Sequence, residues 1–364
     1  MDEKDRLLLT HLQSGLPLTP RPFATWAAKL GTDSADLLVR IQRLKKEGTL
    51  GGVKAVLDAR IFHYQSAWVA LRFGTEDLAS RTEVLWQHPG VTYGCEREHE
   101  FNVWLFISAP ENHDLELHVR CLAKISGAEK VLFLPVRRVY KGTDLLSSLG
   151  PETFSEMDER FEKRQPGHGA ELTTEDIDMI RRLQEPFPLT DEPYQKIAAD
   201  LGITEFQAIE QMKSLVAKKC LKRIGSFLKP VGRIGQEHQA PAEAVLKDWP
   251  SVKVPGAGNL VVWQIPEEKL ERSGPEIAAF REVIYADRRP AYPEFPYSLY
   301  TTIRAETPEA LELITRRMQD RIGKWPHRVM VTTRELKKTG MKYFPKELDA
   351  WWQQNRHINE TAFN

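Results

Sequence analysis

His99 is the side chain whose type and neighbours best suit proton transfer. It lies in the run Arg97-Glu98-His99-Glu100, between two stretches whose apolar residues predict strands, so we expect it in a turn. An imidazole titrates near neutral pH and can act as a general acid or base. If Glu98 and Glu100 lie close to the ring, they raise the pKa of His99 and favour its protonated form. The alternative interpretation is an ordinary surface histidine in a turn.

Cationic side chains gather on the predicted strands or just beyond strand ends. The candidates for ligand binding are Arg97, Arg138, Arg288, Arg289, Arg334 and Lys337. A guanidinium meets a carboxylate with two parallel hydrogen bonds, so these residue types predict a binding site for an acidic ligand. The alternative is that charges near sheet edges are solvated and discourage aggregation.

Aromatic side chains and a second histidine complete the candidate set. Tyr93, Tyr285 and Tyr300 are candidates to donate hydrogen bonds to ligand carboxylates, although such tyrosines are more often amphipathic residues at a core edge. Trp104 and Trp263 are candidates to line a flat slot, with core packing as the alternative. His327, before the last strand, is a second candidate for acid–base chemistry.

The elements that must position these residues occur twice in the chain. The segment 5–50 recurs without a gap as 176–221, and further along Arg97 recurs as Arg289. A repeat of this length is the size of a domain, which indicates duplication of a whole unit rather than a solenoid. Two copies that have diverged favour one composite site built from unequal halves.

Each copy predicts two modules of different kinds. Helices over 4–14, 22–30 and 34–47 followed by a strand over 50–56 predict a winged helix-turn-helix, which 174–228 repeats. Next come strands over 66–73, 91–96, 101–108 and 130–139, with helices over 76–87 and 114–125. Their β-α-β-β-α-β order predicts an antiparallel ferredoxin-like sheet with helices on one face, which 258–340 repeats.

The fold class is therefore α+β, with duplicated winged-helix and ferredoxin-like modules. The expected parts are a first winged helix at 1–60, a first ferredoxin-like domain at 61–150, a linker at 151–172, a second winged helix at 173–230, a second ferredoxin-like domain at 231–345 with an insertion at 229–256, and a C-terminal tail at 346–364.

The composition excludes several classes of protein. The 364 residues are 41% hydrophobic, enough for ordinary cores, and 51 basic residues balance 51 acidic ones. Three distant cysteines form neither a disulfide framework nor a metal pattern, which predicts a reducing, cytoplasmic setting. No apolar run is long enough to span a membrane, and the charged first residues do not resemble a signal peptide.

The helix-turn-helix motifs raise the alternative of a DNA-binding regulator. Residues 32–47 carry four basic side chains against three acidic ones, and residues 203–218 carry two of each. Asp33, Asp36 and Glu205 stand near the starts of the two recognition helices, where carboxylates would repel phosphates. This charge pattern disfavours DNA as a partner and favours scaffold domains.

Several phrases resemble known families. The plan of a winged helix followed by a small α/β module is similar to that of the Lrp/AsnC regulators. More specifically, Arg97-Glu98-His99-Glu100-Phe101-Asn102-Val103-Trp104 resembles the R-E-H-x-[FY]-N-[LV]-W signature of the siroheme decarboxylases. The phrases at 15–23, 259–266, 292–300 and 333–339 are also similar to that family. The resemblance covers nearly the whole chain and is to the fused form of a two-subunit enzyme.

The resemblance implies a carboxy-lyase that removes CO2 from the C12 and C18 acetates of siroheme, for heme d1 or alternative heme biosynthesis. Siroheme is then the partner, no cofactor is needed beyond its own iron, and His99 and His327 are the catalytic candidates, either of which could contact that iron. Other enzymes of the tetrapyrrole pathway and a second copy of the chain are candidate partners, and a membrane is not. A tetrapyrrole-sensing protein without chemistry is the remaining alternative.

Overall fold

The computed structural model describes residues 2–58, 61–74, 78–141, 171–228 and 259–359, and the chain folds into two compact units. The winged-helix unit comprises Met1–His63, Gly167–Ala240 and Lys342–Phe344, and the sheet unit comprises Tyr64–Pro166, Pro241–Met341 and Pro345–Asn364. Most of the expected linker at 151–172 and the whole expected insertion at 229–256 lie outside the described residues.

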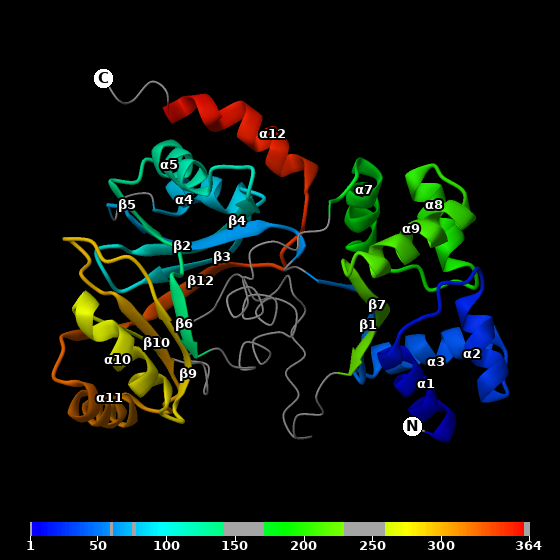
Figure 1. Cartoon of the computed structure of the whole chain (residues 1–364), viewed down its shortest axis with the longest axis horizontal. Helices are drawn as coiled ribbons and strands as arrows, with labels where there is room; N and C mark the ends of the chain where they lie inside the picture. The colour runs from blue at the N-terminus through cyan, green and yellow to red at the C-terminus, as the bar shows by residue number, and fades with distance from the viewer. Residues whose placement is uncertain (1, 59–60, 75–77, 142–170, 229–258, 360–364) are drawn as a thin grey trace. The chain divides into compact units, whose positions relative to one another are not determined.

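The winged-helix unit contains two copies of the same arrangement (Figure 1). The first copy consists of α1 (Glu3–Ser14), α2 (Pro22–Leu30), α3 (Ser34–Lys46) and β1 (Leu50–Leu57). The second consists of α7 (Thr174–Leu183), α8 (Pro193–Leu201), α9 (Glu205–Ala217) and β7 (Leu221–Leu228). The predicted helices and wing strands are thus present in both copies.

Local sequence explains where these helices begin and end. A proline opens α2 and α8, and a left-handed glycine, Gly31 or Gly202, follows each of them. Thr173 and Asp176 form a capping box at the start of α7. The two wing strands pair antiparallel with each other, with Ala55 opposite Ile224, so the two copies share one small sheet.

The sheet unit contains two five-stranded sheets. The first half contributes β2 (Tyr64–Arg72), α4 (Leu78–Gln87), β3 (Val91–Arg97), β4 (Val103–Pro110), α5 (Leu115–Ser126), β5 (Lys130–Leu134) and β6 (Arg138–Lys141). The second half contributes β8 (Asn259–Trp263), α10 (Glu267–Ala278), β9 (Val283–Arg288), β10 (Leu299–Ile303), α11 (Pro308–Ile322), β11 (His327–Met330) and β12 (Thr332–Lys338).

The two halves exchange their last strands. The strand orders are β12-β3-β4-β2-β5 and β11-β8-β10-β9-β6, so β6 of the first half pairs with β9 and β12 of the second half pairs with β3. The prediction of a single strand over 130–139 was therefore wrong. Pro135, between β5 and β6, has no N–H to donate to a ladder, which is consistent with a break at this point.

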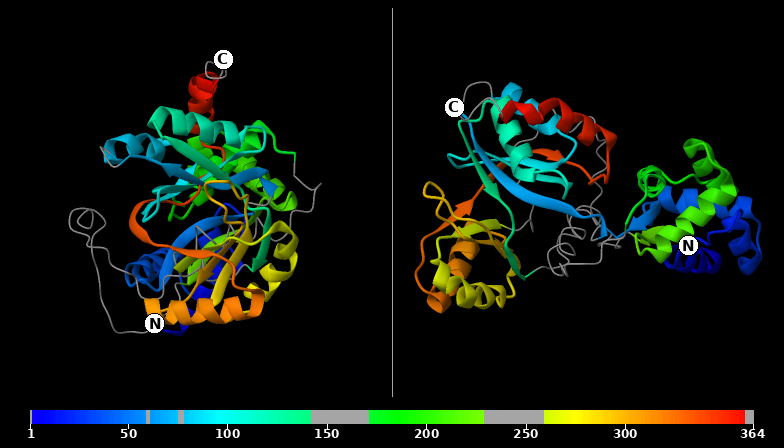
Figure 2. Two further views of the ribbon diagram at one scale, coloured as in Figure 1. Left: turned by 90° about the vertical axis from the view of Figure 1, so that its left-hand side faces the viewer. Right: turned by 45° about the horizontal axis from the view of Figure 1, so that its top comes forward.

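The sheets face each other and carry helices on their outer sides (Figures 1 and 2). Buried residues of both sheets, among them Trp104, Leu132, Val262 and Tyr300, form one cluster between them. We call the faces that meet there the inner faces. The strand β4 is consequently buried on both sides, so its residues do not alternate between core and solvent.

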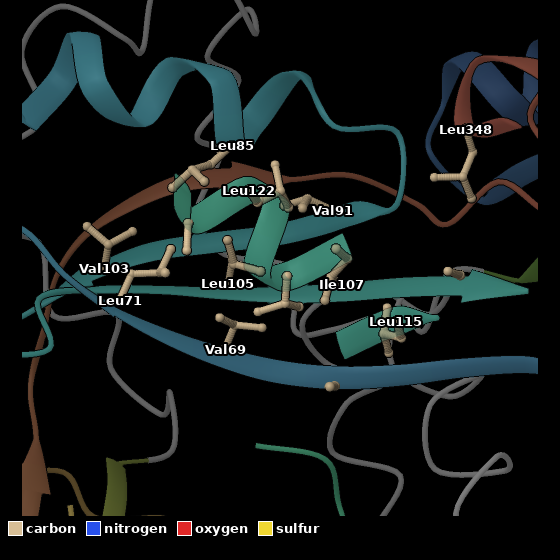
Figure 3. Packing of buried hydrophobic residues seen from close by; sticks show 14 of the residues in the cluster. Val69, Leu71, Leu85, Val91, Val103, Leu105, Ile107, Leu115, Leu122 and Leu348 are labelled. Atoms are coloured by element: carbon tan, nitrogen blue, oxygen red, sulfur yellow. The ribbon is translucent and has the colours of Figure 1, made fainter. Parts of the chain in front are cut away.

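The outer face of the first sheet packs against α4 and α5, and the cluster includes Val69, Leu105 and Leu122 (Figure 3). The segment expected to be a C-terminal tail forms α12 (Lys346–Asn355) and a short 3-10 helix (Arg356–Asn359). Leu348 and Trp351 of α12 pack against the same cluster. The end of the chain therefore completes the hydrophobic core of the first half.

Candidate active site

The inner faces carry most of the side chains that the sequence singled out. The residues placed on or beside these faces are Tyr93, Arg97, His99, Trp104, Tyr285, Arg289 and Tyr300. Tyr93, Arg97 and Trp104 come from β3 and β4, and Tyr285 and Tyr300 from β9 and β10. Strand alternation explains this grouping, because residues two apart on a strand share a face.

His99 lies in the turn between β3 and β4, as the sequence predicts. Its Nδ1 accepts a hydrogen bond of 3.0 Å from the N–H of Phe101, which leaves the proton of the neutral ring on Nε2. The ring stacks on Phe101 and meets Phe295 edge-on at 5.3 Å between centroids. Within the described part of the chain no group bonds to Nε2, so this atom is available to a ligand.

The electrostatics of His99 differ from the expectation. Burial and then the nearby Arg328 lower the pKa of His99, and Glu100 opposes them only in part. Glu100 thus acts in the predicted direction, but burial and Arg328 outweigh it, so the net pKa of His99 is lowered and the protonated form is not favoured. Glu98 and Glu100 are exposed, and Glu100 lies 3.7 Å from Arg72, so water and a competing cation weaken their effect on the imidazole.

Arg97 is a buried cation without a carboxylate partner among the described residues. Its Nη1 donates a 2.8 Å hydrogen bond to the carbonyl of Met330, and its guanidinium lies 5.2 Å from the Trp104 ring centroid. The buried Nε atom has no hydrogen-bond partner in that part of the structure. Only 9% of the residue is exposed. A buried charge in this state is costly, and a ligand carboxylate would offset the cost.

Arg289, the counterpart of Arg97 in the second half, is already neutralised. Its Nε and Nη2 donate three hydrogen bonds of 3.0–3.1 Å to the buried carboxylate of Asp287. The guanidinium also lies over the Tyr300 ring, 4.1 Å from its centroid. Cys95 occupies the position equivalent to Asp287 in the first half, which explains why Arg97 lacks such a partner.

The tyrosines on the inner faces are largely buried. Burial raises the pKa of both Tyr93 and Tyr300, so neither ionises in the neutral range. Tyr93 meets Trp68 edge-on at 5.7 Å, and the Tyr300 hydroxyl has no hydrogen-bond partner among the described residues. Tyr285 hydrogen-bonds to Asp287. These hydroxyls can therefore act only as neutral hydrogen-bonding groups.

The structure does not bring the remaining predicted residues into this group. His327 stacks on Trp263 at 4.8 Å, and Trp263 belongs to the core under α10 and α11, on the outer side of the second sheet. The Trp263 indole N–H bonds to Thr301, as expected for core packing. His99 and His327 thus lie on opposite faces, and a joint role for them in one site does not fit this arrangement.

Four predicted cations also face outward. Arg138 pairs with Glu271, and Arg288 pairs with Glu267, both glutamates coming from α10. Arg334 lies 3.9 Å from Glu96. Lys337 donates to the carbonyls of Trp86 and His88 below α4. The role of these four cations in ligand binding remains a prediction.

The sequence interpretation missed Arg328. This residue directly follows His327 on β11, and alternation along the strand turns it to the inner face, opposite Val262. Its position in a strand next to a candidate histidine was the available signal. The interpretation also missed a chain of buried imidazoles formed by His88, His118 and His113, which lies on the outer side of the first sheet.

Two of the four basic residues of the first recognition helix are engaged within the protein. Arg40 pairs with Asp2, Asp5 and Asp36, and Arg43 pairs with Asp5. Arginines held by carboxylates are poorly placed to neutralise phosphates. These ion pairs count against DNA binding by the first recognition helix, and the scaffold role of these domains stays a prediction.

Two features are absent from the described residues. No helix in the described ranges is long and apolar enough to cross a bilayer. No group of three or more histidine, cysteine, aspartate or glutamate side chains in those ranges is arranged to hold a metal ion.

Comparisons with known proteins agree with this architecture. A family model described as "AsnC-like ligand binding domain" matches residues 62–141 and 256–337, and one described as "Siroheme decarboxylase NirDL-like HTH domain" matches residues 5–50 and 176–221. A crystal structure of the siroheme decarboxylase NirDL, in complex with an iron-uroporphyrin III analogue, superposes with a TM-score of 0.67 at 23% identity and covers 98% of this chain and 100% of that one. This match establishes the shared fold.

Curated relatives narrow the assignment further. The siroheme decarboxylase of Hydrogenobacter thermophilus is 26% identical over 348 residues, which span 95% of this chain and 97% of that protein. The siroheme decarboxylase NirD subunit of Pseudomonas aeruginosa is 32% identical over 143 residues, which span 38% of this chain and 92% of the subunit. Both halves are matched within one polypeptide, and the chain therefore belongs to the siroheme decarboxylase family, in its fused form.

Proposed function

We propose that this protein is a siroheme decarboxylase, a carboxy-lyase that converts the C12 and C18 acetates of siroheme to methyl groups and yields 12,18-didecarboxysiroheme for heme d1 or alternative heme biosynthesis. The observation that carries the proposal is the match to a siroheme decarboxylase over 95% of the chain. The site geometry is consistent with it, because Nε of Arg97 and Nε2 of His99 have no hydrogen-bond partner among the described residues.

Substrate binding in this proposal depends on uncompensated positive charge. Siroheme is an acidic macrocycle, and guanidinium groups hold carboxylates by charge-assisted hydrogen bonds. Arg97 has donor capacity that no protein carboxylate uses within the described residues, whereas Arg289 is saturated by Asp287. The first half therefore offers the substrate acids a cation that the second half does not.

The reaction needs a proton at the carbon that loses CO2. When the bond between the methylene carbon and the carboxylate breaks, CO2 leaves and the electron pair stays on the methylene carbon, next to the pyrrole ring. That carbon then takes one proton and becomes a methyl group. We assign the proton to Nε2 of His99. The doubly protonated ring that delivers it carries its second proton on Nδ1, so charging the ring breaks the hydrogen bond that Nδ1 accepts from the Phe101 N–H.

The remaining features follow from the same proposal. The reaction is redox-neutral, so it calls for no cofactor beyond the iron that the substrate brings. Nε2 of His99 would ligate this iron only if its proton had moved to Nδ1, so iron ligation and proton delivery by Nε2 are alternative roles. A second copy of the chain and other tetrapyrrole enzymes stay candidate partners.

The test is anaerobic incubation of the purified chain with siroheme, followed by mass spectrometry of the tetrapyrrole. Products that have lost one and two CO2 are expected. Unchanged siroheme after incubation with a folded chain that binds it would refute the decarboxylase proposal and leave the tetrapyrrole-sensing alternative. A sample without protein controls for spontaneous decarboxylation.

A further inference from the structure

The turn between β9 and β10 is longer than the equivalent turn between β3 and β4. The backbone N–H of Arg97 donates to the carbonyl of Asn102 at 2.8 Å and closes the first turn. The N–H of Arg289 donates to the carbonyl of Ser298 at 3.0 Å and closes the second. The first bond joins residues five positions apart and the second joins residues nine positions apart, so the second turn has four additional residues.

The longer turn places the ring of Phe295 against His99. Phe295 is fully buried, and its ring meets the imidazole edge-on, with 5.3 Å between the centroids and 79° between the planes. Phe101 lies nearly parallel to the imidazole, at 6.0 Å and 20°. Phe295 also meets Phe101 edge-on at 5.9 Å, so the three rings form one aromatic group. The imidazole therefore packs against one ring from its own half and one from the other half.

The first half holds this turn of the second half in place. Tyr292 and Phe295 exchange two backbone hydrogen bonds of 3.0 Å each, which fold the turn back on itself. The hydroxyl of Tyr292 donates to the carbonyl of Phe133 in β5 at 2.7 Å. Glu294 lies 3.5 Å from Lys130, which also belongs to β5. The position of Phe295 is thus set by contacts with both halves of the sheet unit.

The imidazole and the long turn occur together at only one of the two equivalent positions. The repeat that equates Arg97 with Arg289 places Ala291 at the position of His99, so the second half has no imidazole there. The shorter turn of the first half lacks the additional residues that carry Phe295. A ring that only filled the core between the sheets would be expected at both positions, because both sheets contribute to that core.

We propose that Phe295 is a positioning residue for His99, and that its ring fixes the plane of the imidazole and thereby the direction of Nε2. This inference rests on the proposed function, in which Nε2 delivers the proton. Phe295 brings no charge and no hydrogen-bond donor, and it is fully buried, so it does not hold the substrate itself. Proton transfer requires close and aligned approach, and a displacement of about 1 Å can cost about a hundredfold in rate. Phe295 should therefore affect kcat rather than KM.

The experiment compares variants of the full-length chain in anaerobic siroheme turnover. The variant Phe295→Leu keeps an apolar side chain and removes the aromatic ring. Tyr292→Phe keeps its own ring and removes only the hydroxyl that holds the turn to β5. Leu122→Ala truncates a buried residue of the outer cluster on the same sheet and controls for loss of core packing. Binding sites are counted, and affinity is measured, with uroporphyrin III, whose lack of iron keeps metal ligation out of the comparison.

The expected result is a loss of kcat without a loss of binding. In Phe295→Leu, kcat per binding site falls about ten- to hundredfold, while KM for siroheme and affinity for uroporphyrin III stay as in the wild type. Tyr292→Phe changes kcat in the same direction by a smaller factor. Leu122→Ala keeps the kcat of the wild type.

Two further measurements show whether Phe295 acts through His99. In the double variant with His99→Gln, Phe295→Leu should lower kcat no further, because there is no imidazole left to position. General structural damage would instead multiply the two losses. In NMR spectra at one fixed pH, the ring signal of His99, assigned by its loss in His99→Gln, should shift and broaden in Phe295→Leu.

The outcomes separate this inference from the proposed function. If siroheme is decarboxylated and Phe295→Leu keeps the wild-type kcat, raises only KM, or lowers kcat equally with and without His99, the positioning role is overturned. If the wild type releases no CO2, the decarboxylase proposal fails, and the NMR signal decides the coupling of Phe295 to His99: an altered signal supports it, and an unchanged signal overturns it. Should Phe295→Leu fail to fold, Tyr292→Phe replaces it in every comparison.

Discussion

Acidification should destabilise the sheet unit through three buried imidazoles. The N–H of Gly90 donates to Nδ1 of His88 at 3.0 Å, which leaves the proton of His88 on Nε2. That atom lies 3.2 Å from Nδ1 of His118, whose Nε2 lies 3.3 Å from Nδ1 of His113. This series of hydrogen-bonded imidazoles ends at Asp349 of α12, whose carboxylate lies 3.5 Å from Nε2 of His113. Each ring nitrogen thus has one assigned role, and every ring is neutral.

None of the three hydrogen-bonded imidazoles can take up an extra proton without losing a hydrogen bond. On His118 it would occupy Nδ1, which already accepts the N–H of His88. Burial, and then the neighbouring His113, lower the pKa of His118 from 6.5 to about 3. Burial, His118 and Lys337 also lower the pKa of His88. His118 is fully buried and stacks on Trp352 at 4.1 Å, so α12 covers the chain of imidazoles.

The sign and size of the effect follow from linkage. Below pH 6.5 the unfolded chain binds a proton at His118 and the folded chain does not, so stability falls as the pH falls, until the folded His118 also protonates near pH 3. Each such imidazole costs about 1.4 kcal/mol per pH unit. At pH 5 the loss is about 2 kcal/mol for His118 alone. His88, whose pKa is also lowered, adds to this loss.

The assay is urea unfolding between pH 7 and pH 5, with pulsed hydrogen exchange of α5 peptides to report on the sheet unit rather than on the winged-helix unit. His118→Phe keeps a flat ring against Trp352 but cannot bind the proton. Its stability should therefore depend less steeply on pH, by about 1.4 kcal/mol per unit. His357→Gln removes an exposed histidine and controls for general effects. Equal pH slopes in wild type and His118→Phe would refute the reasoning.

Three further outcomes test the site and the scaffold. His99→Gln should lower decarboxylation at least about a hundredfold, the scale of a general acid, with iron-uroporphyrin affinity measured as the control; unchanged turnover would remove His99 from the mechanism. Cys95→Asp should give Arg97 an internal carboxylate partner, as Asp287 does for Arg289, and should weaken iron-uroporphyrin binding about tenfold or more. The neutral variant Cys95→Asn is the control and should bind iron-uroporphyrin like the wild type. Equal affinities of the two variants would show that Arg97 does not hold the ligand. In an electrophoretic assay at low salt the chain should not shift operator-like DNA, and a specific shift would revive the regulator.

The sequence predicted most of the local structure because the signals were local. Prolines and glycines mark the ends of α2 and α8, and apolar periodicity marks the strands that carry Arg97 and flank the turn with His99. The exchange of β6 and β12 was not predictable in this way, because either strand satisfies its own pattern on any free sheet edge. Which partner is chosen depends on contacts between halves that are distant in sequence.

The same distinction separates the correct and incorrect parts of the site. A run of adjacent residues located His99, but the direction of its pKa shift depends on burial and on Arg328, which is 229 positions away along the chain. His327 shares the chemistry of His99, yet strand alternation turns it toward Trp263 and the outer helices. Residue type suggests what a side chain can do, and the sheet register decides whether it lies where that chemistry is needed.

The divergence of the two halves argues for a single site in each chain. Asp287 neutralises Arg289 inside the protein, so the second half does not need a ligand to compensate its charge. Cys95 leaves Arg97 without that compensation, at a cost of several kcal/mol for a buried cation. If the buried cation had no function in the first half, a carboxylate in place of Cys95 could remove this free-energy cost, as Asp287 does for Arg289 in the second half. The charge is instead retained beside His99, where an acidic substrate would offset it, and we therefore expect the first half to bind the substrate.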